Sequence, residues 1–256
     1  MDRYKKVLLG CTILTTLSSP AFADEFDPFV EFLVFGGIAS LDAGDSTIRI
    51  TSQETDQLVQ TNENDWKAWT GQVGLGYVAQ FAEELSSGEV DWFPIINPQI
   101  NVYYLGGEDI EGDVWRFQDP NFNQADYSMK FHSTRLMFDL ALTIAQIERL
   151  SIYAIGGLGI AWNEIDFNAR STEVCPIEDV SLNSNNDNSF AYEFGGGLTY
   201  AAFDSMAISL EYLYTGFNNI GLGDHNDDVN DQGLDVKASD IDIHSQAVLL
   251  GLRFAL

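Results

Sequence analysis

Apolar and polar side chains alternate with a period of two along most of this chain. Residues 190–200 show it clearly: they read FAYEFGGGLTY, with aromatic and aliphatic side chains at most even positions and small or polar ones at the odd positions. Successive side chains of a β-strand point to opposite faces, so this segment predicts a strand with one apolar and one polar face. The same alternation recurs in the segments 29–40, 69–81, 95–105, 134–142, 150–163, 206–215 and 248–256. The pattern therefore predicts eight β-strands.

The connections between these segments alternate between long and short. The long connections cover residues 41–66, 106–126, 164–188 and 218–239, and the short ones fall near 83–94, 146–149 and 203–205. In an up-and-down meander, this order places every long connection at one end of the sheet and every short turn at the other. Barrels of bacterial outer membranes have this asymmetry, with short periplasmic turns and long external loops.

The apolar face of each predicted strand needs a cover. The sequence nowhere has 18 consecutive apolar residues, so it does not predict a membrane-spanning helix. A closed sheet can cross a bilayer instead, because each of its backbone groups has a partner within the protein. We therefore predict an all-β protein, a closed antiparallel up-and-down transmembrane β-barrel of eight strands. The alternative is a soluble secreted β-sandwich that buries the apolar faces between two sheets.

The N-terminal segment has the features of a secretory signal. Three cations among the first six residues precede a mostly apolar run at 7–17, and Ala-Phe-Ala at 21–23 fits the small-x-small cleavage pattern. The apolar run is shorter than the roughly 20 residues that a membrane-spanning helix needs. We expect residues 1–23 to be a signal peptide and residues 24–256 to form the outer-membrane β-barrel domain.

The charge of the chain restricts its partners. The chain has 12 Lys and Arg against 39 Asp and Glu, a formal net charge of −27. Nucleic acid is excluded as a partner because its phosphates would be repelled. Most acidic residues fall in the long connections, outside the lipid, so the charge is compatible with a membrane. We expect outer-membrane lipid and lipopolysaccharide around the barrel, host or other cell-surface molecules at its loops, and a monomeric state.

Six charged residues fall on the predicted interior face: Glu31, Arg135, Asp139, Glu193, Glu211 and Arg253. Glu31 and Arg253 lie on the first and last strands, which must be neighbours in a closed barrel, so we predict that they approach each other inside it. The two arginines can pair with some of the four carboxylates but cannot neutralise all of them. A side-chain-filled interior would plug so narrow a barrel. The alternative is a narrow pore whose carboxylates favour cations.

Acidic residues are densest in the last long connection. The candidate cation ligands there are Asp224, Asp227, Asp228, Asn230 and Asp231. Their spacing partly resembles a calcium loop, but no Glu follows at the twelfth position. We expect a solvated loop, with weak calcium binding as the alternative, and we predict no cofactor and no other metal site.

The strands also resemble those of a known family. Glycine-rich segments at 71–77, 156–160 and 195–200, the segment 211–215 and the apolar closing strand are similar to those of the OmpA-like, opacity-type family of small outer-membrane barrels. The resemblance implies a place in the bacterial outer membrane. It also implies a non-enzymatic structural role, with adhesin-like surface contacts through four long acidic external loops. Such patterns specify architecture rather than activity, so a narrow porin-like channel for ions or small solutes stays open as the alternative.

Two histidine arrangements raise the question of an enzyme. His132 and Ser133 are adjacent and therefore lie on opposite faces of a strand, which rules out a direct general-base hydrogen bond. Asp242 and His244 share one face near the loops, an arrangement similar to that of proteolytic outer-membrane barrels. We expect no catalytic residues, and a protease or lipid-modifying barrel is the least favoured alternative.

Overall fold

The structure is a computed structural model of the chain. It describes residues 28–44, 46–51, 54–62, 65–80, 86–87, 90–92, 95–171, 180–181, 185–221, 237–238 and 241–256. Across these ranges we find no helix with both the length and the apolar character that a membrane crossing needs. The expected signal peptide, residues 1–23, and the acidic segment 224–231 lie outside the described residues.

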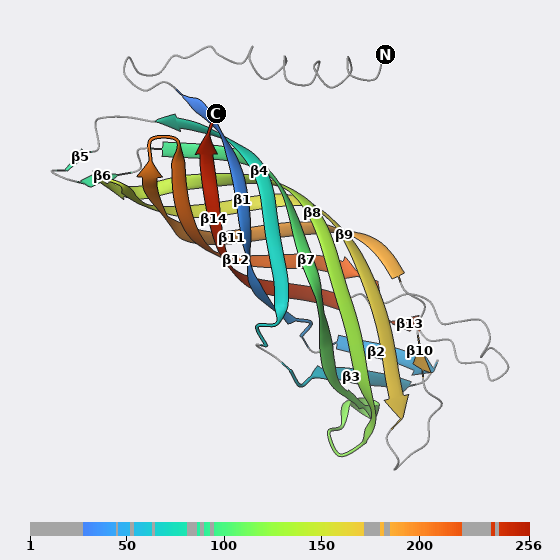
Figure 1. Cartoon of the computed structure of the whole chain (residues 1–256). Coiled ribbons are helices and arrows are strands. Elements are labelled where there is room, and N and C mark those ends of the chain that lie inside the picture. Colours follow the sequence, from blue (N-terminus) through green and yellow to red (C-terminus); the bar gives the residue numbers. More distant parts are fainter. Residues whose placement is uncertain are drawn as a thin grey trace, which may run out of the picture.

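Eight long strands form the wall of the molecule. They are β1 (Phe29–Asp42), β4 (Ala68–Gln80), β7 (Ile95–Trp115), β8 (Asn123–Ile147), β9 (Leu150–Ser171), β11 (Asn185–Phe203), β12 (Met206–Ile220) and β14 (Ile241–Ala255). Each of them pairs antiparallel with the next one along the chain. The last strand also pairs with the first, from Glu31↔Ala255 to Asp42↔His244, so the sheet closes on itself (Figure 1). The predicted eight-stranded up-and-down barrel is confirmed, and the β-sandwich alternative is wrong.

The middle of the wall presents its apolar face outward, as the alternation predicts. Large apolar side chains are exposed on every one of the eight strands, among them Val34, Leu75, Ile100, Phe138, Leu158, Phe194, Leu210 and Leu250. Such a band of exposed apolar side chains belongs in lipid rather than in water. Aromatic side chains border it, with Trp69 and Trp162 toward the long connections and Tyr200 toward the short turns. Aromatic residues at these positions are typical of the two membrane interfaces.

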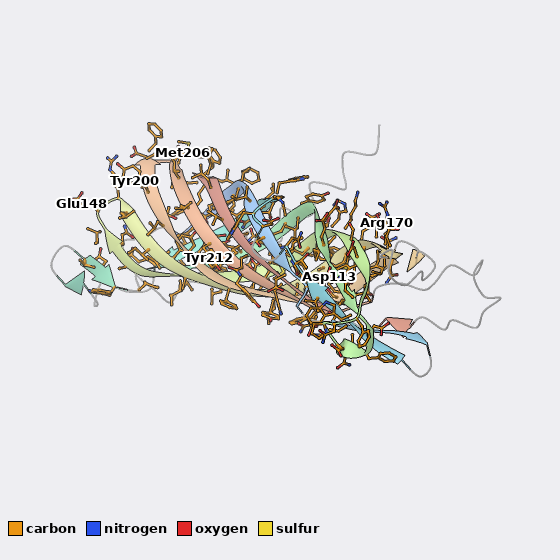
Figure 2. The ribbon with its side chains drawn as sticks, turned by 90° about the horizontal axis from the view of Figure 1, so that it is seen from below. Asp113, Glu148, Arg170, Tyr200, Met206 and Tyr212 are labelled. Carbon is orange, nitrogen blue, oxygen red and sulfur yellow. The ribbon has the colours of Figure 1, made fainter. Side chains whose placement is uncertain are left out.

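We call the side with the short connections the turn end and the opposite side the loop end. The turns at 148–149 and 204–205 agree with the predicted short links. The third short link is more regular than expected, because β5 (Ser86–Ser87) and β6 (Val90–Trp92) pair within it and β6 also pairs with β8. Glu148, Tyr200 and Met206 mark the turn end in Figure 2, and Asp113 and Arg170 lie toward the loop end.

Three neighbouring strands continue far beyond the lipid at the loop end. β7, β8 and β9 contain 21, 25 and 22 residues, whereas a tilted strand crosses a bilayer in about 9–11 residues. The segment 106–126 is therefore mostly strand, and the prediction of a long loop there was wrong. A short turn remains, which contains the 3-10 segment η3 (Arg116–Gln118).

The other long connections are also partly regular. β2 (Ser46–Thr51) and β3 (Glu54–Gln60) occupy much of the segment 41–66, and β3 pairs with the extended part of β7. Two short strands, β10 (Val180–Ser181) and β13 (Lys237–Ala238), pair with β9 and β2. The long external loops expected from the sequence are therefore partly strand, and the described parts of these connections lengthen the wall.

The polarity of the two faces reverses where the strands leave the lipid. In the part of β8 near the loop end, Tyr127, Met129 and Phe131 are buried in the interior, while Asp126 and Lys130 are exposed on the outside. Water replaces lipid around this part of the barrel, so the apolar side chains turn inward. Apolar and polar side chains still alternate with a period of two beyond this boundary, but the apolar ones now lie on the inner face. Because of this change, the sequence pattern did not reveal that the strands continue toward the loop end.

Candidate functional site

The interior of the lipid-embedded part is polar. All six charged side chains predicted for the interior are buried, each at most 7% exposed. They come from β1, β8, β11, β12 and β14, and they form two clusters, each organised around one arginine. Burying a charge without a partner is very costly, so the geometry of each cluster decides whether the interior is stable.

The first cluster surrounds Arg253 on the closing strand. Arg253 Nη1 lies 2.9 Å from Glu31 Oε1, and its Nη2 lies 3.7 Å from Glu211 Oε2. The Nε–H of Arg253 donates to Ser209 Oγ at 2.9 Å, and the Tyr153 hydroxyl donates to Glu211 Oε2 at 2.6 Å. Glu31 and Arg253 thus lie side by side across the seam between β1 and β14, where barrel closure was expected to bring them.

The second cluster surrounds Arg135 on β8. Arg135 Nε lies 3.4 Å from Glu193 Oε2, and the guanidinium carbon lies 4.4 Å from the centre of the Tyr103 ring. Asp139 accepts hydrogen bonds at Oδ2 from Asn101 Nδ2 at 2.6 Å and from the Tyr103 hydroxyl at 3.3 Å. Arg135 is therefore held by a carboxylate and by an aromatic face together, which is favourable for a desolvated guanidinium.

Glycines on the interior face let side chains from alternate strands meet. Gly157 pairs with Asp139 on one side and with Glu193 on the other. A Cβ at Gly157 would lie 1.7 Å from Asp139 Oδ1, so the carboxylate occupies the space above the bare Cα. Gly197 has the same relation to Tyr153, whose hydroxyl would lie 2.5 Å from an added Cβ. The two clusters depend on these glycines as much as on the charges.

The predicted network named only charged residues, and the structure adds uncharged ones. They line the same interior face: Asn97, Gln99, Asn101, Tyr103, Tyr153 and Ser209. Three of them follow a visible signal, because Asn97, Gln99 and Asn101 share one strand face at spacing two. Tyr153 and Ser209 could not be assigned from sequence, because their contacts with Glu211 and Arg253 depend on the register between strands, which the sequence pattern does not fix.

Above the charged clusters, toward the loop end, the interior becomes apolar. The rings of Phe131 and Phe217 meet edge to face with centroids 5.3 Å apart, and the rings of Tyr127 and Phe167 stack at 5.7 Å. We call this group the loop-end core; it also contains Leu41, Leu58, Ile110, Val114, Met129, Ile165, Ile220, Ile241 and Ile243. Arg135 joins the two regions, because its guanidinium carbon lies 5.7 Å from the centre of the Phe217 ring.

Two of the three histidines lie in the part of the chain that the structure describes, and both are on the outer face of the wall. Ser133 is buried on the inner face, while His132 faces outward and accepts a hydrogen bond at Nδ1 from the Gly107 N–H at 3.0 Å. His244 faces outward and stacks on the Tyr214 ring at 5.5 Å. Within the described ranges, no group of three or more His, Cys, Asp or Glu side chains could hold a metal ion. The acidic segment 224–231 lies outside those ranges, so its cation binding stays a prediction.

Comparison with known proteins agrees with this architecture. The family model described as the OmpA-like transmembrane domain matches residues 103–246. The fold is similar to that of OprG from Pseudomonas aeruginosa, with 14% identity, 88% of this chain and 96% of that chain covered, and a TM-score of 0.39.

Two further solved structures are similar in fold. Neisserial surface protein A shares 11% identity, with 90% of this chain and 100% of that chain covered and a TM-score of 0.33. Ail of Yersinia pestis shares 14% identity, with 88% and 98% covered and a TM-score of 0.32. No curated protein matches the sequence.

Proposed function

The chain belongs to the OmpA-like transmembrane domain family, and from this premise we propose that it is a closed, non-enzymatic barrel of the bacterial outer membrane. In this role it strengthens the membrane and presents its acidic loop end to molecules outside the cell. The interior serves stability rather than transport.

The observation that supports a closed interior is contact across the lumen. Arg135 on β8 reaches the Phe217 ring on β12, and Phe131 meets the same ring. Arg253 on β14 lies 5.0 Å from the centre of the Tyr153 ring on β9. In each case, two other strands lie between the contacting strands along the shorter way around the barrel. Side chains that meet in this way leave a small barrel filled rather than open.

A surface role is supported by the charge at the loop end. Farther toward the loop end, the outer faces of β7, β8 and β9 expose Asp126 and, in part, Asp113 and Asp166. A wall that extends beyond the membrane raises these carboxylates above the lipid surface. We propose that the partners of this end are cell-surface molecules with basic groups, because electrostatic complementarity speeds and selects such encounters.

The second candidate function is a narrow cation channel. It is favoured by one observation: four carboxylates share the interior with two arginines, so the charged clusters carry an excess of negative groups. Rings of carboxylates select cations in pores. Conduction through this barrel would require the cross-lumen contacts of Arg135 and Arg253 to open.

Planar bilayer recordings distinguish the two functions. We expect the refolded wild-type protein to give no reproducible conductance steps, and an Arg135→Ala/Arg253→Ala variant to gain them, because both cross-lumen contacts of the arginines are then removed. The Phe138→Ala variant, altered on the lipid face, serves as the control. Regular wild-type steps whose cation selectivity falls in Glu193→Gln would contradict a closed interior and establish the channel.

The absence of catalysis has a separate test. Lipid A and peptide substrates are incubated with the wild type and with His132→Ala and His244→Ala variants. Turnover by the wild type that either variant abolishes would establish an enzyme and overturn this part of the proposal. We expect no turnover by any of the three proteins.

A further inference from the structure

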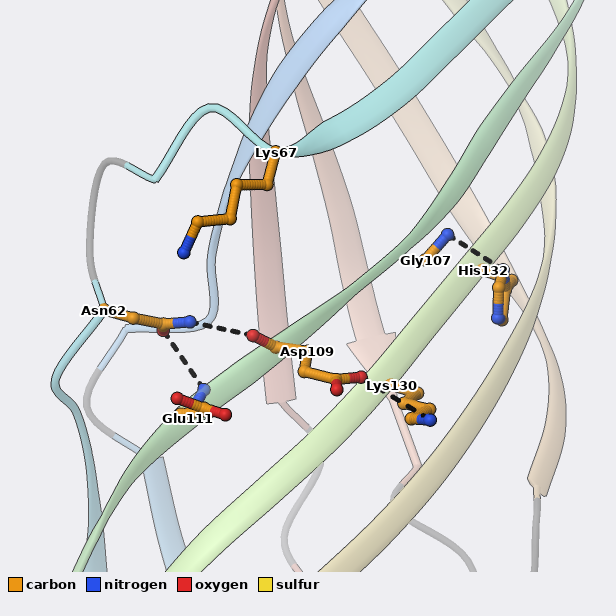
Figure 3. Close-up of a pocket in the computed structure, with 7 residues that line it drawn as sticks. All are labelled: Asn62, Lys67, Gly107, Asp109, Glu111, Lys130 and His132. Atoms are coloured by element: carbon orange, nitrogen blue, oxygen red, sulfur yellow. Dashed lines mark hydrogen bonds and ion pairs between the residues drawn. The ribbon is translucent and has the colours of Figure 1, made fainter.

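A recess lies on the outside of the wall at the loop end, on β7 and β8, where Asn62 of the link from β3 to β4 lies against the edge of β7. Its lining residues are Asn62, Lys67, Gly107, Asp109, Glu111, Lys130 and His132 (Figure 3). Asn62 fastens the link to the wall: its Nδ2 donates to the Asp109 carbonyl oxygen at 2.7 Å, and its Oδ1 accepts from the Glu111 N–H at 3.1 Å. These two hydrogen bonds hold Asn62 against the outer edge of β7.

The strand register places the recess directly above the lipid. Thr134 on β8 pairs with Tyr104 on one side and Trp162 on the other, and both aromatic side chains are exposed on the outer face. Lys130 is four residues farther along the same face, roughly 13 Å along the strand at about 3.3 Å per residue. Interfacial aromatic rings mark the boundary of the hydrocarbon. The recess thus opens at the height of the headgroups of the outer leaflet.

The recess has a lysine ammonium group on each of two opposite sides. Lys67 directly precedes β4 and Lys130 lies on β8, with Asp109 and Glu111 between them (Figure 3). Both lysine side chains are mostly exposed, and they take part in ion pairs: Lys67 Nζ lies 2.6 Å from Asp65 Oδ2, and Lys130 Nζ lies 3.9 Å from Asp109 Oδ1. Exposed ion pairs contribute little to stability, so either lysine can exchange its partner at small cost.

The two carboxylates also fit a phosphate ligand when a divalent cation accompanies it. Mg²⁺ is usually bound through one or two carboxylates together with phosphate oxygens and water. Asp109 and Glu111 lie two residues apart on one strand face and supply the carboxylates. The lysines supply the point charges that proteins use for phosphate. The recess therefore combines groups for a phosphate with groups for its counter-ion.

We propose that this recess binds a phosphate group of the outer-leaflet glycolipid, with Lys67 and Lys130 on the phosphate and Asp109 and Glu111 on a bridging Mg²⁺. A lipid phosphate is the source that fits, because the opening faces outward immediately above the lipid belt. The site is independent of whether the lumen conducts, since both lysines lie on the outer side of the wall.

Lipid A binding to the full-length protein in detergent micelles tests the proposal, with native mass spectrometry as the readout. We expect Lys67→Gln/Lys130→Gln to weaken binding of diphosphorylated lipid A about tenfold or more in Mg²⁺, because two charge-assisted contacts are lost. Arg149→Gln is the matched control, since it removes a cation at the turn end and should leave binding unchanged. EDTA should weaken binding to the wild type.

Three results would overturn the site. They are an equal loss of binding in Arg149→Gln, equal binding of fully dephosphorylated lipid A, and displacement of lipid A by inorganic phosphate at the same phosphate concentration. The last result would identify a soluble anion as the ligand. Heat-modifiable gel mobility verifies folding of each variant. If the glutamine variant fails this check, Lys67→Ala and Lys130→Ala are measured singly, and unchanged lipid A binding in both would equally overturn the site.

Discussion

The lipid-embedded part and the loop end of this barrel are built from the same strands with opposite polarity. In the lipid-embedded part of β8, Leu136, Phe138 and Leu140 face lipid, while Arg135 and Asp139 are buried inside. Nearer the loop end of the same strand, the buried residues are aromatic and aliphatic, and the outer ones are polar. The same strand thus contributes polar side chains to the barrel interior within the lipid and apolar side chains to the interior beyond it.

The comparison shows that the surrounding solvent, and not the strand, decides which face is apolar. In lipid, an apolar exterior costs nothing, and the narrow interior can hold paired charges and amides. In water the same wall must hide its apolar side chains, so the loop-end core is driven by hydrophobic burial. The two regions should therefore respond differently to the same kinds of substitution.

The largest expected difference concerns two phenylalanines of β8. Phe131 is fully buried in the loop-end core, whereas Phe138 is 61% exposed on the lipid face. Phe131→Ala should lower the free energy of unfolding by about 3–5 kcal/mol, as for a large cavity in a packed core. Phe138→Ala should cost much less, because lipid fills the space that it leaves.

Urea unfolding in lipid vesicles, followed by tryptophan fluorescence, measures both changes. The comparison fails if the two substitutions cost the same, because the loop end would then lack a core of its own.

A lysine substitution on the outer face of β8 tests where along the strand the lipid ends. Leu140→Lys puts a charge in the lipid belt and should cost about 2–4 kcal/mol, as measured for bilayer midplanes. Ser128→Lys, on the same strand and face but above the lipid, should stay within about 0.5 kcal/mol of the wild type. The measurement is the same vesicle unfolding assay, and a large cost at Ser128 would place the membrane boundary higher than the polarity reversal indicates.

The polarity reversal also explains which parts of the fold the sequence could predict. All eight strands were located through their lipid-facing alternation, and closure followed because a sheet in lipid cannot leave an edge unpaired. The extensions of β7 and β8 were missed, since Asp109, Glu111 and Lys130 make the outer face resemble a loop. The alternation continues in these extensions with the apolar side chains on the inner face, and this pattern would have predicted them.

The interior charges were predictable for a related reason. Glu31 and Arg253 lie on the first and last strands, so closure alone makes them neighbours. The partners of Arg135 were not predictable in this way, because Tyr103 and Glu193 approach it through strand stagger, which single-sequence patterns do not encode. The outer recess was missed because its geometry depends on how the link at Asn62 folds against β7.

Adjacent glycines offer a finer test of the interior. Gly157 faces inward beneath Asp139, whereas Gly156 faces outward, where an added Cβ would be 3.7 Å from its nearest neighbour, the Glu193 carbonyl oxygen. Gly157→Ala should cost about 1–3 kcal/mol, because the carboxylate must leave its position in a packed interior. Gly156→Ala should be nearly neutral. Equal effects in the vesicle assay would mean that Asp139 moves freely and that the lower interior is not tightly packed.

The smallest expected effect is at the outer face of the loop end. Lys130 and Asp109 are paired across β7 and β8, but their charged groups lie 3.9 Å apart and are about half exposed. A double-mutant cycle of Lys130→Gln and Asp109→Asn should therefore give a coupling of about 0.2–1 kcal/mol, in the range of other exposed pairs. A coupling above about 2 kcal/mol would mean that the pair holds the wall together. A small value means that the pair is free to exchange its partners, so a loss of lipid A binding in the lysine variants would reflect the recess and not a weakened barrel.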